Sequence, residues 1–463
     1  MSKARHQVGP RHGTQALLSS DYQNGVRYAW SILIEPIFPV EETGLPVGAV
    51  SYGDMLLPLA RRAAPSKEVL LEFVPSHFFR EQGHGLPRSM PEPPLETIEG
   101  VPLLYGRPVV TRDGDRFVVH ADIIASTYFM VTRYEEMVRR DVRDEHGRFP
   151  GRESLPYRAG FIDRPIVEEY AALLRKWLRA VGVAVPEPKR RFTFLPTHDV
   201  DRLRFYSRWD DPYRVVAAAL RGRRPRRMIG EALGCAWRLR KDPWALDVFD
   251  EMIRLDEVCA KESVYFFMAG GGSAYDGRYD VRGKDARRVI EKVREAGASI
   301  GLHASYEAGE HPQRIAEEKA RLEEVCGLPI RRNRHHYLAW REIEHGWELA
   351  KAGIDWDSTM GYADIAGFRL GVCHPIPLFD PVKLKPMGIE EHPLIAMDGT
   401  LSYSKYMNLS EEEAFCYCKR LADQTRKHNG EFVTVWHNTS FSRHLDEYHH
   451  RLYRRLISYL SAQ

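Results

Sequence analysis

The sequence predicts an α/β protein, because short apolar runs alternate with helical patterns along its second half. After residue 190, runs rich in β-branched and aromatic residues are followed by longer segments whose apolar residues recur every three or four positions. Several of these runs end directly in Asp or His. Such alternation is typical of a parallel sheet covered by helices, so we expect a closed barrel or an open sheet with polar side chains at its strand ends.

The composition is that of an ordinary globular protein. The 463 residues are 43% hydrophobic and 28% charged, with a formal net charge of +3, which is too small to indicate a nucleic-acid-binding protein. The six cysteines form no pair of CxxC motifs, so we expect neither a structural zinc site of that kind nor a disulfide framework. We find no apolar segment behind the basic amino terminus and no long apolar window. We therefore expect a cytoplasmic protein without a secretory signal or transmembrane helix.

Residues 1–187 are predicted to form a mixed α/β domain. Two apolar runs predict short strands, and two segments with helical spacing predict helices. The strands are expected at 28–40 and 69–74, and the helices at 122–139 and 167–181. The polar stretch VPEPKRR, which begins at Val185, contains two prolines and predicts a linker to a second domain at 188–463.

The second domain carries the alternation of strands and helices. Its predicted strands are 192–197, 264–268, 298–303, 329–336, 353–357, 392–397 and 431–437. Its predicted helices are 245–260, 284–296, 311–325, 340–351, 409–427 and 443–461. Helices between consecutive strands favour parallel strand pairs, whose carboxyl ends meet at one edge of the sheet.

The first predicted strand of this domain ends in two aspartates. It reads FTFLPTHDVD (192–201), and because side chains alternate along a strand, Asp199 and Asp201 share one face if the strand persists. Unpaired carboxylates are costly to bury, so the pair must meet solvent, a shared proton or a cation. A simpler alternative is a strand that leaves the core into a polar turn, with Asp201 capping the next segment.

Histidines follow three further strands. GLHASYE places His303 and, four residues later, Glu307 after one strand, while NRHHYL places His336 after another and FVTVWHN brings His437. A single histidine after an apolar run is usually structural. Two imidazoles and a carboxylate from different strand ends, however, match the ligands of a divalent metal that keeps an open position for water.

Taken in order, the motifs THDVD, LHASYE, RHHY and VWHN resemble those of the polysaccharide deacetylases of the NodB-like superfamily, the family-four carbohydrate esterases. The stretches ASTYFMVTRYEE (125–136), FIDRPIVEEY (161–170) and DSTMGYADIAGFRLG (357–371) resemble a bacterial branch in which that domain follows one of unassigned function. The resemblance implies a distorted, incomplete (β/α) barrel of the NodB type at 188–463, preceded by the smaller mixed α/β domain.

The resemblance also implies roles for four residues. Asp199 corresponds to the general base, Asp201 and His303 to metal ligands, and His437 to the general acid. The ion that such ligands imply is a single divalent metal, for which we expect Zn²⁺.

This sequence departs from the family pattern at the third metal ligand. Where the family has a histidine four residues after the first, this chain has Glu307. Where the family has proline in its third motif, this chain has His336, which we expect to be the third ligand, with Glu307 as the rival. Arg334, Tyr337 and Asp357 are expected to contact the substrate.

The implied activity is metal-dependent removal of an N-acetyl group from an amino sugar or glycan in cell-surface polysaccharide biosynthesis. Two alternatives stay open: a C–N hydrolase acting on a small non-sugar amide, and a non-catalytic glycan-binding scaffold. The expected partner is an N-acetylated sugar or glycan, with a polymer, a lipid-linked and a nucleotide-linked form left open, and no nucleic-acid partner is expected. The basic run Arg221–Arg227 is either a solvated loop or a contact for an anionic glycan, a phosphate-bearing carrier or the inner membrane face.

Overall fold

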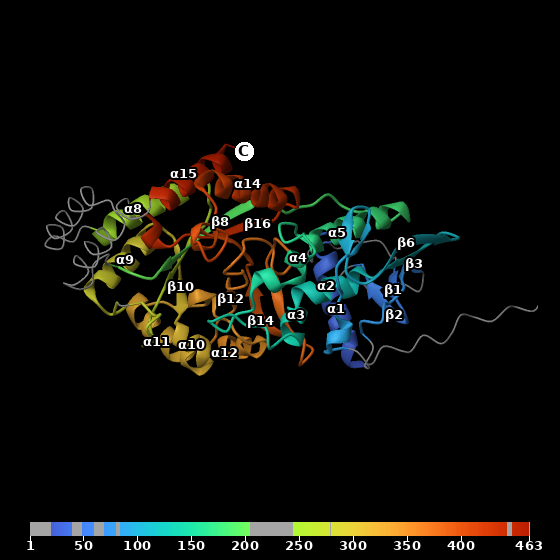
Figure 1. Cartoon of the computed structure of the whole chain (residues 1–463), viewed down its shortest axis with the longest axis horizontal. Coiled ribbons are helices and arrows are strands. Elements are labelled where there is room, and N and C mark those ends of the chain that lie inside the picture. Colours follow the sequence, from blue (N-terminus) through green and yellow to red (C-terminus); the bar gives the residue numbers. More distant parts are fainter. Residues whose placement is uncertain are drawn as a thin grey trace, which may run out of the picture.

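The structure is a computed structural model of the chain. It describes residues 20–38, 49–59, 69–79, 84–203, 244–277, 279–441 and 447–462. Figure 1 shows two parts that lie side by side along the long axis of the molecule. The described residues before Thr193, here called the N-terminal region, surround a five-stranded sheet, and the remaining residues surround a nine-stranded sheet. The protein is therefore a mixed α/β chain.

The N-terminal region builds its sheet in the order β2-β1-β3-β7-β6. The two inner pairings, β1 with β3 and β3 with β7, are parallel, and both edge strands are antiparallel. Its strands are β1 (Ala49–Tyr52), β2 (Met55–Pro58), β3 (Val69–Phe73), β6 (Gly106–Asp113) and β7 (Arg116–Ala121), with a separate hairpin of β4 (Glu96–Ile98) and β5 (Val101–Leu103). Its main helices are α1 (Ser20–Ile34), α2 (Ile123–Val131), α3 (Tyr134–Val138), α4 (Leu155–Arg158) and α5 (Ile166–Ala180).

One prediction for this region is wrong. The run that begins at Tyr28 was expected to be a strand, but it continues helix α1, which starts eight residues earlier. Val26, Ala29, Trp30 and Leu33 recur at helical spacing and are all buried. The strand expected at 69–74 and the helix at 167–181 are confirmed by β3 and α5, whereas the helix at 122–139 is broken into α2 and α3 by a left-handed Arg133 (φ 57°).

The nine-stranded sheet is curled into a half-barrel. Its strand order is β13-β14-β12-β11-β10-β9-β8-β16-β15, and all neighbours are parallel except β13 and β14. The strands are β8 (Thr193–Val200), β9 (Val264–Phe267), β10 (Ser299–Ala304), β11 (Arg332–His335), β12 (Trp356–Asp357), β13 (Ile376–Asp380), β14 (Lys385–Glu391), β15 (Leu394–Met397) and β16 (Glu431–Val435). Each of the seven strands expected from the sequence overlaps one of these, while β13 and β14 were not expected.

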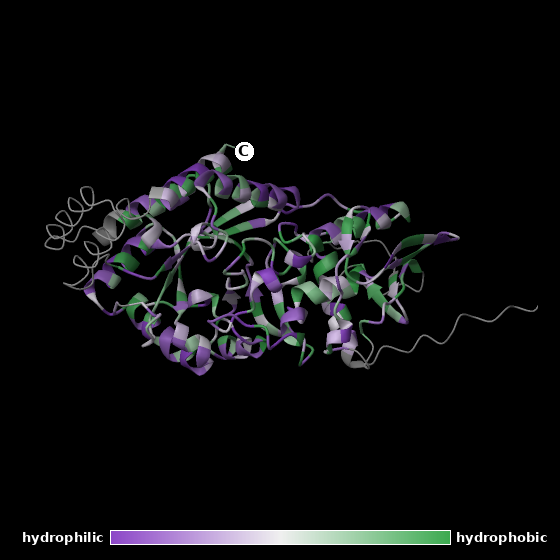
Figure 2. Ribbon diagram, in the orientation of Figure 1, coloured by the Kyte–Doolittle hydropathy of each residue, from purple (hydrophilic) through white to green (hydrophobic). Residues whose placement is uncertain are grey.

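The outer side of the half-barrel is covered by helices such as α8 (Trp244–Asp256), α9 (Lys284–Glu295), α11 (Ile315–Cys326) and α15 (Glu447–Ser461), and further helices connect its strands (Figure 1). These further helices are α10 (Tyr306–Glu310), α12 (Gly346–Lys351), α13 (Asp398–Ser402) and α14 (Glu411–Lys427). In α9, Ala286, Val289, Ile290 and Val293 are buried at helical spacing, so this helix packs on the sheet through one apolar stripe. Figure 2 shows the same pattern more widely, with hydrophobic residues on the strands and on the helix faces turned toward them.

The alternation of side chains along β8 decides which residues face the interior of the half-barrel. Leu195 packs with Phe266 of β9 and Val433 of β16 in a small apolar cluster. Thr197 and Asp199 follow Leu195 at intervals of two, so they lie on the same face. His198 lies on the other face, against the outer helices.

Buried ion pairs join the N-terminal region to the half-barrel. Arg369 donates two hydrogen bonds to Glu136, of 2.9 and 2.7 Å, and both side chains are buried.

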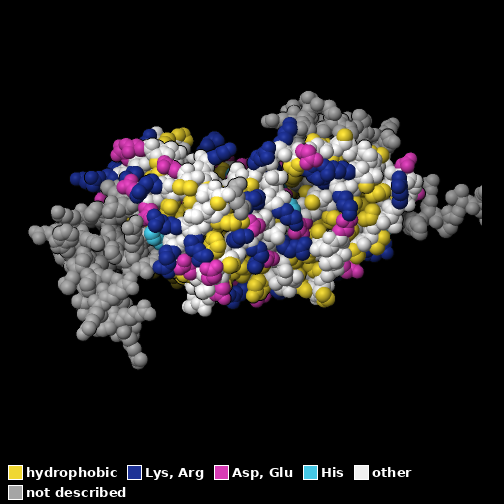
Figure 3. Space-filling model, turned by 90° about the horizontal axis from the view of Figure 1, so that it is seen from above, with side chains coloured by type: hydrophobic (Ala, Val, Ile, Leu, Met, Phe, Trp, Pro, Cys, Tyr) yellow, Lys and Arg dark blue, Asp and Glu magenta, His cyan; other side chains and the backbone are white. Residues whose placement is uncertain are grey.

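Figure 3 shows Lys and Arg side chains interspersed with Asp, Glu and hydrophobic side chains over the face that it draws. Within the described ranges, no helix has both the length and the apolar character needed to cross a membrane. The basic run Arg221–Arg227 lies outside the described residues.

Candidate metal site and pocket

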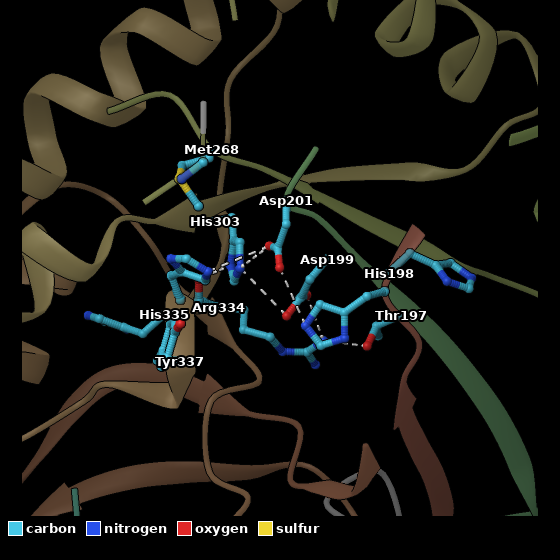
Figure 4. A network of polar contacts seen from close by, with 12 residues as sticks. Thr197, His198, Asp199, Asp201, Met268, His303, Arg334, His335 and Tyr337 are labelled. Carbon is cyan, nitrogen blue, oxygen red and sulfur yellow. Dashed lines mark hydrogen bonds and ion pairs between the residues drawn. The ribbon is translucent and has the colours of Figure 1, made fainter. Parts of the chain in front are cut away.

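Three side chains from three strand ends form a group that could hold a metal ion. Potential ligand atoms of Asp201, His303 and His336 all lie within 4.8 Å of one another. Oδ1 of Asp201 is 3.4 Å from Nε2 of His303 and 3.7 Å from Nε2 of His336. Asp201 follows β8, His303 lies in β10, and His336 directly follows β11, so the parallel strands bring the three together. Figure 4 shows Asp201 and His303 turned toward each other.

The His303 imidazole is held in the orientation that a metal ligand needs, and the His336 imidazole has a carboxylate behind it. Nδ1 of His303 lies 2.9 Å from the carbonyl oxygen of Arg334, and donation of a proton there leaves the lone pair of a neutral ring on Nε2. Nδ1 of His336 faces Oδ1 of Asp276 at 3.5 Å while its Nε2 faces Asp201. A carbonyl or carboxylate behind the ligand nitrogen is the usual arrangement around metal-bound histidines.

The unsatisfied atoms of this group fit a cation. Oδ1 of Asp201 and Nε2 of His303 are buried without a hydrogen-bond partner. Burial alone would raise the pKa of Asp201, but His336, His303 and His437 together hold this pKa well below its usual range. Burial lowers the pKa of His303, but Asp199 and Asp201 outweigh it and raise this pKa. The surroundings of Asp201 and His303 therefore favour a positive charge between them, and a divalent ion would supply it.

Asp199 lies beside this group and is held from behind by an arginine. Nη1 of Arg334 is 3.3 Å from Oδ1 of Asp199, while Oδ2 of Asp199 lies 3.6 Å from Nε2 of His303. Arg334 is fully buried and also donates to the carbonyl and hydroxyl oxygens of Ser358, each at 2.7 Å. The expectation that Arg334 contacts the substrate does not match this position, because its guanidinium is enclosed beneath the pocket and fixes Asp199 instead.

Asp357 is also enclosed, although it was expected at the substrate. Its Oδ1 accepts from the Asn333 amide at 2.6 Å and its Oδ2 from the backbone N–H of Thr359 at 2.8 Å. Burial raises the pKa of Asp357, and burial and the charge of Asp357 raise the pKa of the neighbouring Glu391. The nearby like charge and the burial therefore favour the neutral form of Glu391.

His437, which follows β16 beside β8, is paired with a carboxylate that the sequence analysis missed. Nδ1 of His437 lies 2.7 Å from Oδ1 of Asp398, and Oδ2 of Asp398 accepts the backbone N–H of His437 at 2.9 Å and the hydroxyl of Ser440. Burial lowers the pKa of His437, but Asp398 and Asp201 raise it to about 10. Asp398 directly follows the apolar run 394–397, so the strand-end signal used for the other residues could have found it.

The cluster opens into a pocket of about 320 Å³. Its lining includes Asp199, Asp201, Asp276, His336, Tyr337 and His437. Further aromatic and basic residues also line it: Arg148, Arg202, Tyr275, Tyr403, Lys405 and Tyr406. Arg148 belongs to the N-terminal region, so both parts of the chain contribute to this pocket.

Three polar residues of the sequence motifs lie outside the cluster. Nε2 of His198 bonds Asp256 at 3.0 Å, and its ring points away from Asp199 in Figure 4. Glu307, the rival third ligand, pairs with Arg314 at 2.6 Å. His335 is fully buried, and burial lowers its pKa to about 3. His336 is thus the residue that the structure brings to Asp201 and His303.

Comparisons with known proteins cover parts of the chain. Residues 64–182 match the model of a family of unknown function, DUF7033. No curated protein matches the chain. Among solved structures, the chain is similar to one from Mycobacterium smegmatis described as a "putative polysaccharide deacetylase", with 17% identity over 61% of this chain and 87% of that chain, at a TM-score of 0.36.

Proposed function

We propose that the protein is a metal-dependent hydrolase that removes an N-acetyl group from an amino sugar or glycan. One observation carries the proposal: Asp199 and His437, which is paired with Asp398, both lie against a His-His-Asp ligand group that opens into a pocket. Hydrolysis of an amide needs a base for the water and an acid for the departing amine. Asp199 would be the base and His437 the acid. The proposal includes a distorted barrel of the NodB type for residues 188–463 and a separate mixed α/β domain for 1–187.

Asp201, His303 and His336 would hold the ion. Two imidazoles and one carboxylate with an open position suit Zn²⁺ better than Mg²⁺, which prefers oxygen ligands. When bound, such an ion supplies Lewis acidity that polarises an amide carbonyl and acidifies water. The Asp201 side chain is 25% exposed and the His303 side chain only 1%, so the open side of the group faces the pocket through Asp201.

Asp199 would accept the proton of the attacking water. Its Oδ1 is fixed by Arg334, and its Oδ2 faces the ligand group at His303. Oδ2 of Asp199, which is not bonded by Arg334, is therefore the oxygen that lies next to the proposed metal site and its water. Arg334 holds this carboxylate in place without a side-chain movement at the moment of reaction, which is how buried polar groups contribute to a preorganised site.

His437 would donate a proton to the leaving amine. Its Nδ1 is engaged by Asp398, and its Nε2 lies 3.8 Å from Oδ2 of Asp201, so Nε2 faces the reaction centre. The raised pKa keeps the ring protonated at neutral pH, as a general acid requires. Acetate and a free amine are the products. Tyr337, which lines the pocket, would contact the sugar.

The proposal is tested by an acetate-release screen with N-acetylated sugars, nucleotide sugars and lipid-linked glycans, together with small non-sugar amides, with metal content measured alongside. Release from sugars alone supports the proposal, and release from the small amides alone supports the alternative hydrolase. A protein that binds glycans and yields no acetate with full metal occupancy would be a scaffold. We place the substrate in the cytoplasm, with peripheral contact to the inner membrane face as part of the same proposal.

A further inference from the structure

The turn that carries the third ligand has an unusual backbone. Tyr337 has φ 60° and the next residue, Leu338, has φ 53°. Residues with a Cβ seldom adopt this left-handed conformation, and two in succession are rarer still. Such a conformation persists only where surrounding contacts impose it, and it is concentrated at functional sites.

The turn carries three consecutive residues that all line the pocket but have different further surroundings. His336 joins the ligand group, Tyr337 enters the wall of the pocket, and Leu338 is buried in the apolar cluster inside the half-barrel. A conventional strand would place alternate residues on opposite faces. The left-handed residues therefore redirect the chain directly after His336, and the position of this ligand depends on what holds the turn.

A loop of the N-terminal region holds the turn through its backbone. Nη1 of Arg148 donates a 2.6 Å hydrogen bond to the carbonyl oxygen of Tyr337. The side chain of Arg148 is only 8% exposed, and its Nε is anchored on Oδ2 of Asp144 at 2.8 Å. The partner residues are 189 positions apart in the sequence, so this bond joins the two parts of the chain at the site.

The same loop also packs on the side chain of Tyr337. The ring centroid of His146 lies 4.8 Å from that of Tyr337. The loop itself is preorganised, because Oδ1 of Asp144 accepts the backbone N–H groups of His146 and Arg148, both at 2.9 Å. Gly147, with φ 74°, lets the loop lie against Arg341, whose Cδ would be 2.8 Å from an added Cβ. Both the carbonyl and the ring of Tyr337 are therefore fixed by the loop 144–148.

We propose that Arg148 is a positioning residue for the metal site: by clamping the Tyr337 carbonyl, it keeps the left-handed turn in place and His336 directed at Asp201 and His303. This inference rests on the proposed function only in taking His336 as a metal ligand. It gives the segment 64–182, which matches a family of unknown function, a defined role at the site of the half-barrel.

The test compares Arg148→Ala with Arg140→Ala in the full-length protein. Arg140 also joins the two parts of the chain, with ion pairs to Glu342 (2.9 Å) and Glu344 (2.5 Å), but it does not contact the turn. Zn²⁺ affinity is measured by competition with a chelator, and the visible spectrum of the Co²⁺-loaded proteins reports the geometry of the ligands. Thermal unfolding of the metal-free proteins shows whether each variant is folded.

We expect Arg148→Ala to weaken Zn²⁺ binding by about tenfold or more and to alter the Co²⁺ spectrum, as loss of supporting contacts around metal ligands usually does. Arg148→Lys should recover little, since a lysine cannot bond both the Tyr337 carbonyl and Asp144 with fixed geometry. Arg140→Ala should leave both readouts unchanged. In a Tyr337→Gly background, where the left-handed backbone is unstrained, Arg148→Ala should weaken Zn²⁺ binding less than it does in the natural protein.

Three results would overturn the inference. Unchanged Zn²⁺ affinity and Co²⁺ spectrum in Arg148→Ala would show that the turn keeps its conformation without Arg148. An equal loss in Arg140→Ala would show that any loosening between the two parts has this effect. Unchanged metal binding with a raised KM would make Arg148 a substrate contact. Failure of the deacetylase proposal is recognised separately, because a natural protein that binds Zn²⁺ but releases no acetate leaves the metal-affinity comparison intact.

Discussion

His437, which lines the pocket, forms a hydrogen-bonded pair with Asp398, with Nδ1 and Oδ1 2.7 Å apart. The two residues follow neighbouring parallel strands, β16 and β15, so the sheet itself sets their separation. The carboxylate on one strand end orients the imidazole on the next, so that His437 faces the pocket and its pKa is raised.

Replacing Asp398 should move the basic limb of the pH–rate profile. The carboxylate favours the charged imidazolium and so raises the pKa of His437, to about 10. In Asp398→Asn this pKa should fall toward the ordinary value of about 6.5, so that activity disappears at a lower pH and the rate at pH 8 drops roughly tenfold or more. Ser440→Ala is the matched control, because it removes a neutral hydrogen bond to the same carboxylate and should leave the basic limb nearly in place.

The third ligand can be decided by metal content. His336→Ala should lose most of its bound Zn²⁺, because removal of one of three protein ligands leaves an incomplete site. Glu307→Ala should keep full occupancy, since this carboxylate is paired with Arg314. Elemental analysis of both purified variants is the measurement. Full occupancy in His336→Ala combined with loss in Glu307→Ala would reverse the assignment.

The buried carboxylate Glu136 should be important for stability. Burial alone would raise its pKa, but Arg133 and Arg369 lower it to about 2. Since the folded-state pKa lies below the ordinary value of about 4.5, the stabilisation is complete above that pH and is lost as the pH falls through about 2. Glu136→Gln should lower the free energy of unfolding at pH 7 by about 3–5 kcal/mol, because two buried guanidinium groups lose their partner.

Urea denaturation of the metal-free protein measures this effect. Glu344→Gln, which breaks a partly exposed pair with Arg140, serves as the control and should cost at most about 1 kcal/mol. An equal and small effect of both substitutions would show that the contact between Glu136 and Arg369 contributes no more than a surface pair.

Local patterns predicted much of the half-barrel and part of the site. The strand ends that carry Asp201, His303 and His437 could be recognised because each follows a short apolar run. The alternation of these runs with helices predicts parallel strands, whose ends meet at one edge of the sheet. Asp199 and His198 are adjacent in the sequence, but the alternation of side chains along β8 places them on opposite faces of the sheet. Strand β14 escaped prediction because its inward positions include a buried glutamate, Glu391, which breaks the apolar pattern.

The remaining site residues depend on contacts between distant segments. Arg148 reaches Tyr337 across 189 positions, and no local spacing can reveal such a bond. Asp276 lies in a glycine-rich loop, where a carboxylate usually indicates a turn; only the fold shows that it faces His336. Arg334 and Asp357 were recognised as polar residues near strand ends, but their enclosure beneath the pocket follows from the curvature of the sheet, which the sequence pattern does not specify.

The most direct test of the central claim separates the two aspartates of THDVD. Asp201 is expected to hold the ion and Asp199 to accept a proton, so Asp201→Ala should lose both Zn²⁺ and acetate release. Asp199→Asn keeps the shape of the side chain but cannot act as a base, so it should retain Zn²⁺ and substrate affinity while turnover falls by roughly two orders of magnitude or more. Turnover close to that of the natural protein in metal-loaded Asp199→Asn would contradict the proposed mechanism.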